Sequence, residues 1–287
     1  MTPLLDIVPF REGCVMDLKK LLEMDGEFQA WEVNATNRDL VRLMRMGIVR
    51  IAFKTNRNTY WEVVDKEKLK NLIRLKETKI ELPKDEPLFS SIIGYEKQKE
   101  ILLRCIENKQ HCLLLGKPSL AKTLFLLELT KVGGYYMTSY VTMASLFDVL
   151  SFVKPKILLI DEIDRIKDKD AYALLNNLLQ YGLIAKHTYN FEARVKVDTI
   201  VIATANTVKN LPDTLISRFL IVKFEEYSDE EYENVVRKLL KDRPKEVVER
   251  IIEVTKPYKD VRNALKLARI CKSKEDVDYF SDIIKFG

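Results

Sequence analysis

The chain has 287 residues, of which 47% are hydrophobic and 32% are charged, and this composition excludes a disordered chain and supports one large or two to three small globular domains. Lys and Arg total 48 against 43 Asp and Glu, so the net charge of +5 is too small to indicate a nucleic-acid partner by itself. The cysteines and histidines lack metal-ligand spacing, and neither a signal peptide nor an apolar run of about 18 residues is present, which predicts a cytoplasmic protein without structural zinc.

Residues 1–75 are predicted to form a small domain of helices and one β-hairpin. The segments VMDLKKLLEMDG and NRDLVRLMRMG carry apolar residues at helical spacing, whereas IVRIAFKTNRNTYWEVV alternates and turns at residues 55–58. Helices followed by a hairpin resemble the winged helix-turn-helix modules of transcription and replication proteins. A linker is predicted over residues 76–88, where charge and prolines interrupt the hydrophobic periodicity.

Basic residues occur on both the second predicted helix and the hairpin of this domain. In the winged-helix interpretation Arg38, Arg42 and Arg45 lie on the recognition helix, and Lys54 and Arg57 lie on the wing. Because cations at these places neutralise phosphates, Arg38, Arg42 and Arg57 are predicted to contact DNA. The alternative is a solvated face on a module that binds another protein or the following domain of this chain.

A candidate phosphate-binding loop lies in residues 111–126, HCLLLGKPSLAKTLFL. A short apolar run, a loop and an amphipathic helix form the strand, loop, helix context that such a loop requires, and the N–H groups and helix dipole there surround a phosphate. Lys122 is expected to reach the β- and γ-phosphates of ATP, and Thr123 to bind Mg²⁺. The expected ATP-binding loop residues are Gly116, Lys117, Pro118, Ser119, Leu120, Ala121, Lys122 and Thr123.

A second motif follows at residues 156–164, KILLIDEID, an apolar strand that ends in carboxylates and has the Walker B pattern. We expect Asp161 to lie beside the loop of the neighbouring strand, where it can hold Mg²⁺. Glu162, one residue later, is placed to polarise the attacking water. The alternative interpretation is a buried strand that ends in acidic loop residues, without a nucleotide. It would explain the loop motif or the Walker B pattern alone but poorly explains both together, so the two motifs predict an ATP site.

Four further segments resemble elements of the AAA+ ATPases. TIVIATAN at residues 199–206 is similar to the sensor 1 strand, with Asn206 as the sensor, and LPDTLISRF at residues 211–219 is similar to the arginine-finger segment, with Arg218 entering a neighbouring subunit's site. DVRNALKL is similar to the sensor 2 helix, which implies that Arg262 touches the γ-phosphate. FSSIIGYEKQ resembles the adenine-side segment, with Ile93 and Gly94 beside the base.

This resemblance covers about 200 residues and implies a P-loop α/β sheet domain at residues 89–225 and a helical lid at residues 226–287. It also implies a homo-oligomeric ring, expected to be a hexamer, that uses ATP and Mg²⁺ at its subunit interfaces.

An extra β-hairpin is predicted ahead of residue 199, because LLQYGLIAKHTYNFEARVKVD is longer than a helix-to-strand connection needs and has two alternating halves. A hairpin here resembles the AAA+ superclass that includes minichromosome maintenance helicases, RuvB-type motors, magnesium chelatases and MoxR-type chaperones. Lys186 and Arg194 are expected to contact a DNA strand through its phosphates. The alternative is a hairpin that grips a protein, with Tyr189 or Phe191 as its aromatic residue.

The loop GKPSLAKT is similar to those of minichromosome maintenance helicases, which also have Ser and Ala where most AAA+ proteins have Gly. Those helicases are much longer, and RuvB-type motors carry their winged helix at the C-terminus. We expect an ATP-hydrolysing motor that acts on DNA as a helicase, a translocase or a replication or recombination assembly factor. Two alternatives stay open: a protein-remodelling ATPase of the MoxR or chelatase type, and a clamp-loader-like ATP-dependent DNA-binding switch.

Overall fold

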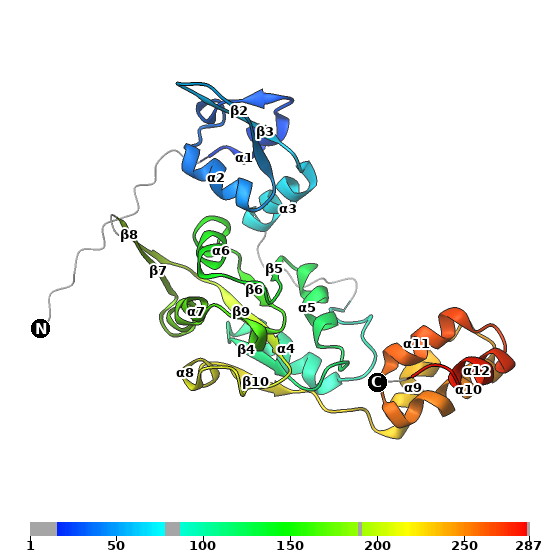
Figure 1. Cartoon of the computed structure of the whole chain (residues 1–287). Coiled ribbons are helices and arrows are strands. Elements are labelled where there is room, and N and C mark those ends of the chain that lie inside the picture. Colours follow the sequence, from blue (N-terminus) through cyan, green and yellow to red (C-terminus); the bar gives the residue numbers. More distant parts are fainter. Residues whose placement is uncertain (1–15, 78–86, 189–190, 286–287) are drawn as a thin grey trace, which may run out of the picture.

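The computed structural model describes residues 16–77, 87–188 and 191–285. Three parts follow one another along the chain, as Figure 1 shows: a small N-terminal unit, a domain built on a parallel sheet, and a bundle of helices at the C-terminus. None of the described helices is both long and apolar enough to cross a membrane.

The N-terminal unit combines helices with a three-stranded antiparallel sheet of order β1-β3-β2. Thr36 caps the second helix by accepting the Asp39 N–H, and the Thr55 N–H donates to the Asn58 carbonyl across the hairpin turn at 2.8 Å, which confirms the hairpin predicted there. Its elements are α1 (Leu18–Glu23), β1 (Glu27–Phe28), the 3₁₀ helix η1 (Ala30–Val33), α2 (Asn37–Arg45), β2 (Val49–Lys54), β3 (Thr59–Val63) and α3 (Lys66–Glu77).

Helix α3 continues to Glu77 and therefore enters the segment that was predicted to be a linker, residues 76–88. The rest of that segment up to residue 86 lies outside the described residues. The helix continues because Leu69 and Leu72 are buried on one face of it, so packing rather than local composition decides where it ends.

The central domain is a parallel sheet of order β10-β4-β9-β6-β5 with helices on both faces, which confirms the predicted α/β class. Strands buried on both sides are continuously apolar, as in ILLI of β6. The elements are α4 (Glu96–Glu107), β4 (Cys112–Leu115), α5 (Lys122–Thr130), β5 (Gly134–Met137), α6 (Met143–Asp148), the π-helix η2 (Val149–Val153), β6 (Ile157–Ile160), η3 (Ile163–Arg165), α7 (Lys169–Tyr181), β7 (Leu183–Thr188), β8 (Phe191–Lys196), β9 (Ile200–Ala205), α8 (Asp213–Ile216) and β10 (Leu220–Lys223).

The strand order corrects one expectation and confirms another. Strand β6, which precedes Asp161, is not the neighbour of β4, because β9 pairs with both of them and lies between them. The predicted extra hairpin is present, since β7 and β8 pair antiparallel from Leu183 opposite Lys196 to Thr188 opposite Phe191.

The C-terminal bundle has a hydrophobic core of its own that includes Tyr232, Val236, Ile251 and Leu267. Ser228 caps its first helix by accepting the Glu231 N–H. Its elements are α9 (Asp229–Leu239), α10 (Lys245–Thr255), η4 (Lys256–Tyr258), α11 (Val261–Ile270) and α12 (Lys274–Ser281).

The N-terminal unit packs on the α6 side of the sheet domain, and the apolar side chains of the two parts form one continuous core cluster (Figure 1). An Arg45 guanidinium nitrogen lies 2.8 Å from the Asp148 carboxylate at the end of α6, and Arg42 Nε lies 3.8 Å from it. The Lys76 ammonium lies 4.0 Å from the centre of the Phe152 ring in η2. Apolar burial, ion pairs and a cation–π contact thus hold the two parts together.

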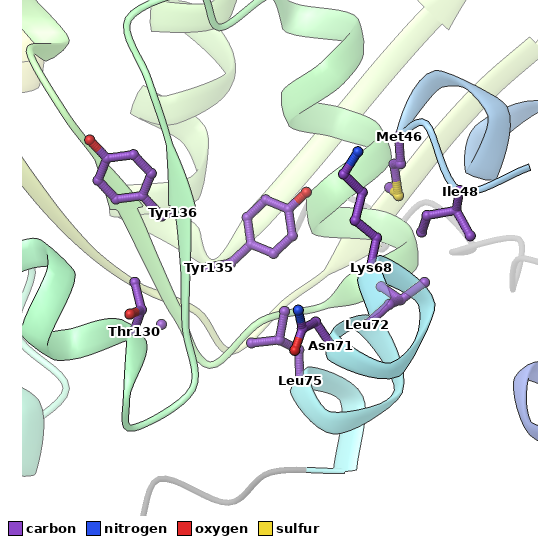
Figure 2. A pocket seen from close by; sticks show the side chains of 10 residues that line it. Met46, Ile48, Lys68, Asn71, Leu72, Leu75, Thr130, Tyr135 and Tyr136 are labelled. Atoms are coloured by element: carbon purple, nitrogen blue, oxygen red, sulfur yellow. The ribbon is translucent and has the colours of Figure 1, made fainter. Parts of the chain in front are cut away.

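A cavity of about 310 Å³ remains at this junction, between helix α3 and strand β5. Figure 2 shows the Tyr135 ring pointing toward α3, whereas the neighbouring Tyr136 ring points to the other side of β5. Alternate residues of a strand face opposite sides of its sheet, so only Tyr136 is directed toward the layer that contains the phosphate loop.

Candidate functional site

The predicted ATP residues gather at one edge of the sheet. The carboxyl ends of β4, β6 and β9 meet there, because parallel strands all end on the same side. The loop after β4 supplies Lys122 and Thr123, the turn after β6 supplies Asp161 and Glu162, and the end of β9 supplies Asn206.

The loop from Gly116 to Thr123 has the backbone of a phosphate cradle. Ser119 (φ 77°) and Ala121 (φ 59°) are both left-handed, which costs a residue with a Cβ on the order of 1 kcal/mol. A Cβ on Gly116 would lie 2.5 Å from the Phe224 carbonyl oxygen, so only glycine fits. Among the residues that the structure describes, the N–H groups of residues 119 and 121–123 donate to no backbone acceptor within 3.5 Å. Such free donors in a left-handed turn at a helix start suit an anion.

Lys122 is buried inside this loop. Its ammonium donates to the carbonyl oxygens of Gly116 (2.8 Å) and Lys117 (2.6 Å) and to Oδ1 of Asn206 (3.2 Å). Burial lowers the pKa of Lys122, while the carboxylates at the ends of β6 act in the opposite direction. The loop therefore holds a cation where the phosphates are expected.

Asp161 receives three hydroxyl groups. Thr123 Oγ1 lies 3.1 Å from its Oδ2, Tyr136 donates at 2.8 Å, and Thr204 donates to Oδ1 at 2.6 Å. Burial and the bond to Asp161 raise the pKa of Tyr136, so the phenol stays a donor. A hydroxyl beside a carboxylate is the oxygen donor set that Mg²⁺ requires, so Thr123 and Asp161 fit this ion.

Sequence reasoning missed Tyr136 and Thr204. Thr204 had a recognisable signal, a hydroxyl near the end of the otherwise apolar strand β9. Tyr136 had none, since it stands among other polar and aromatic residues of β5.

Glu162 is held in position by its backbone and by Asn206. Its φ is 52°, its N–H donates to Thr204 Oγ1 at 2.8 Å, and its Oε1 accepts the Asn206 Nδ2 amide at 3.4 Å. Arg165 pairs with the other carboxylate oxygen at 3.1 Å. Asn206 thus connects the buried ammonium of Lys122 to the carboxylate of Glu162.

Asp164 is a further residue whose contribution the sequence did not reveal. Its buried Oδ2 accepts the N–H groups of Asn206 and Thr207, both at 3.2 Å, and so fixes the end of β9. Its Oδ1 has no partner among the described residues.

The lid reaches this loop through Arg262, whose guanidinium contacts Ser119 Oγ and pairs with Asp260 at 3.0 Å. Ile93 packs against the core of the lid, and Gly94 (φ 80°) follows it at the junction of the two parts. Both predicted base-side residues therefore lie where the lid meets the sheet domain.

Arg218 is not part of this cluster. It follows Ser217, the C-cap residue of α8. Its guanidinium donates to the Thr214 carbonyl and to the Gln180 side chain of α7. Its buried Nε has no partner among the described residues. Within one chain it contacts none of the ATP residues named above.

The residues predicted to contact DNA differ in their surroundings. Arg38, Arg57 and Arg194 are exposed. Arg42 is only 11% exposed and pairs with Asp39 and Asp148, so the expectation that it faces DNA is corrected: packing of α2 on α6 turns it toward the sheet domain. The side chain of Lys186 lies outside the described part of the structure.

Comparisons with known proteins agree with this architecture. Residues 112–227 match the model of the "ATPase family associated with various cellular activities (AAA)". Three solved variants of Thermotoga maritima RuvB are similar in fold. The first has a TM-score of 0.54 and 19% sequence identity, and the match covers 68% of this chain and 71% of that chain. The second has a TM-score of 0.53 and 21% identity, with coverages of 67% and 71%, and the third has a TM-score of 0.53 and 20% identity, with coverages of 70% and 72%. No curated protein sequence matches the chain. Residues 112–227 therefore match an AAA ATPase domain, and the sheet domain has the same fold as these RuvB structures.

Proposed function

We propose that this chain is an ATP-hydrolysing AAA+ motor that acts on DNA as a ring of identical subunits. The observation that carries the ATPase proposal is the connected set Lys122–Asn206–Glu162 beside the Thr123–Asp161 pair. A buried cation, a carboxylate held by an amide and a hydroxyl–carboxylate pair are the groups that phosphoryl transfer to water requires.

Each residue then has a role in the reaction. The N–H groups of the loop and Lys122 bind the β- and γ-phosphates, and Ile93 and Gly94 flank the base. Thr123 and Asp161 hold Mg²⁺, which when bound neutralises charge on the phosphate oxygens. Glu162 orients a water molecule and accepts its proton, and Asn206 keeps that carboxylate in position.

The assembly proposal rests on Arg218 and Arg262. Arg262 already contacts the loop of its own chain, so it can respond to the γ-phosphate in cis. Arg218 contacts no ATP residue of its own chain, and a guanidinium that stabilises the departing phosphate from a neighbouring subunit would give it a function. We take the ring to be a hexamer, by the AAA+ resemblance.

The proposal that DNA is the substrate rests on three observations. The fold is similar to RuvB, a hairpin precedes β9, and exposed basic side chains lie on two hairpins, Lys54 and Arg57 on β2–β3 and Arg194 on β8. We propose that the N-terminal unit is a winged helix, because its described elements follow the order of that module.

A protein-remodelling ATPase is the second candidate. One observation favours it: α2, the recognition helix of the winged-helix interpretation, is used to dock on a protein surface, since Arg42 and Arg45 both pair with Asp148.

ATP turnover with and without single-stranded, duplex and branched DNA tests the proposal. Lys122→Ala removes a charge-assisted contact and should weaken nucleotide binding about tenfold or more. Glu162→Gln should keep nucleotide bound and lower turnover about 100-fold or more.

Lys97→Ala and Glu107→Gln, two exposed changes on α4, serve as matched controls that should behave as wild type. Normal turnover by Glu162→Gln would refute the assignment of the site. If no DNA form binds at low salt or stimulates turnover, the DNA proposal gives way to the protein-remodelling candidate.

A further inference from the structure

The N-terminal unit cannot present the whole of α2 to a partner while it is docked. Asp148 is only 8% exposed and pairs with Arg42 and Arg45, and the apolar side of α2 belongs to the core cluster that spans both parts of the chain. A helix packed on α6 in this way is not free to enter a DNA groove. The wing formed by β2 and β3 lies away from this contact, at the far side of the unit (Figure 1).

The wing carries an irregularity that exposes an aromatic ring. Ile51 pairs with Trp61, but Phe53 pairs with Tyr60, so Ala52 is an extra residue and forms a bulge. In a regular strand Phe53 would share the inward face of Val49 and Ile51. The bulge turns it outward, onto the face of Tyr60, where it is 42% exposed.

Phe53 and Tyr60 form a stacked pair on this outer face. Their ring centres are 4.4 Å apart and their planes differ by 16°. The face of an exposed, stacked ring accepts another flat ring, and nucleobases stack on aromatic side chains without sequence preference.

The charged residues of the same hairpin indicate which kind of flat ring would stack on this pair. Lys54 and Arg57 are exposed, and neither has an acidic partner in the part of the chain that the structure describes. Arg50, on the same face, pairs with Glu62 of β3. Lys54 follows Phe53 at the end of β2 and Arg57 lies in the hairpin turn, so the same hairpin carries stacked rings and cations without an acidic partner. This combination is complementary to a polyanion of stacked rings.

We propose that the wing binds unpaired bases of single-stranded DNA, which stack on the Phe53–Tyr60 pair while Lys54 and Arg57 contact the backbone. The proposal rests on the proposed function, in that DNA is the substrate, and it adds that the N-terminal unit recognises unpaired strands with α2 still docked. Duplex DNA offers no free base face to the wing and should bind more weakly.

Fluorescence anisotropy of labelled single-stranded and duplex oligonucleotides, at several salt concentrations, tests this with the full chain. Phe53→Ala and Phe53→Leu should weaken single-strand binding about tenfold, whereas Phe53→Trp, which keeps a stacking ring, should bind as wild type. A 2-aminopurine base in the strand should be quenched by wild type and not by Phe53→Ala. Lys54→Ala should lower the salt slope by about 1. Circular dichroism checks that each variant is folded.

Two controls separate the wing from other surfaces. Trp31→Ala removes another exposed aromatic ring of the same unit, 70% exposed on η1, and should not change binding. Asp148→Ala releases the arginines of α2; it should leave single-strand affinity within twofold, and a gain in duplex affinity without any loss from Phe53→Ala would overturn the proposal in favour of α2.

The failures of the two proposals differ. If wild type binds both DNA forms and the Phe53 variants bind equally well, the wing proposal is refuted and DNA remains the substrate. If wild type binds neither form at low salt, the proposed DNA function fails, and the wing proposal fails with it.

Discussion

Among the single side chains, Asp161 is the most informative, because three hydroxyl groups converge on its carboxylate. Thr204 and Tyr136 satisfy its lone pairs from β9 and β5, while Thr123 approaches from the loop. Hydrogen bonds from a second layer of residues orient a metal-binding carboxylate and limit its motion. We therefore expect the Tyr136 hydroxyl to orient the Asp161 carboxylate, a contribution that the sequence motif around Asp161 does not reveal.

Tyr136→Phe should raise the Mg²⁺ concentration for half-maximal ATP turnover about tenfold, because the carboxylate loses one orienting donor. Turnover at saturating Mg²⁺ should fall much less. A Mg²⁺ titration of the rate measures both values.

Tyr135→Phe is the matched control, since its ring points to the other side of β5 (Figure 2). Equal Mg²⁺ dependence of the two variants would show that the Tyr136 hydroxyl has no part in holding the metal.

At the element scale, β4 is the strand on which the site is built, and His111 at its start ties it to both neighbouring strands. The His111 Nδ1 accepts the Val201 N–H of β9 at 3.0 Å, and its carbonyl accepts the Leu220 N–H of β10 at 2.9 Å. Burial lowers the pKa of His111 from its ordinary value of 6.5, against the effect of a hydrogen bond with the Leu179 backbone. Protonation of His111 Nδ1 would turn this acceptor into a donor, and the Val201 N–H would lose its hydrogen bond.

The free energy of unfolding should therefore fall as the pH drops below about 6.5. The unfolded chain takes up the His111 proton first, so stability rises with pH in this window, by at most about 1.4 kcal/mol per pH unit. His111→Asn keeps an acceptor near Nδ1 but does not titrate, and should show a shallower decline. Urea unfolding at pH 7.5, 6.5 and 5.5 measures the difference.

His187→Asn, at the other histidine of the chain, controls for the loss of a titrating group. Parallel stability curves for wild type and His111→Asn would contradict this account of the strand.

The elements also show which patterns are predictable. The hairpins at residues 49–63 and 183–196 follow from alternation within a few residues, which is a local property. The bulge at Ala52 does not, because it depends on how β2 aligns with β3 around the buried Trp61. Nor does the position of β9 between β4 and β6, since strand order depends on contacts between distant segments.

At the scale of the whole molecule, the three parts are joined in different ways. The N-terminal unit shares an apolar core with the sheet domain, whereas the lid has its own core and reaches the loop through Arg262. Arg218 points to Gln180 and away from its own ATP residues. This arrangement suits a chain whose site is completed by a second copy.

Arg218→Ala should abolish turnover while ATP binding persists, because the proposed ring would lose at every subunit interface a charge that acts on the leaving phosphate. Mixed with Lys122→Ala, which keeps its Arg218 but has a defective loop, it should regain turnover above the sum of the two separate rates. A coupled ATPase assay of the mixture measures this complementation.

Lys209→Ala, an exposed change between β9 and α8, is the matched control and should turn over ATP as wild type does. Wild-type turnover by Arg218→Ala alone would contradict a role for this residue between subunits.

Local patterns in the chain were sufficient to locate the loop after β4, the acidic end of β6 and both hairpins, because side-chain periodicity and turn residues act over a few positions. Contacts between residues far apart in the sequence were decided only by the tertiary structure. Thr204 reaches Asp161 across 43 positions, and Arg45 reaches Asp148 across 103; the second contact turns α2 toward the sheet domain and leaves the β2–β3 hairpin exposed. Such contacts depend on strand order and on which faces pack together, and no short stretch of sequence records either.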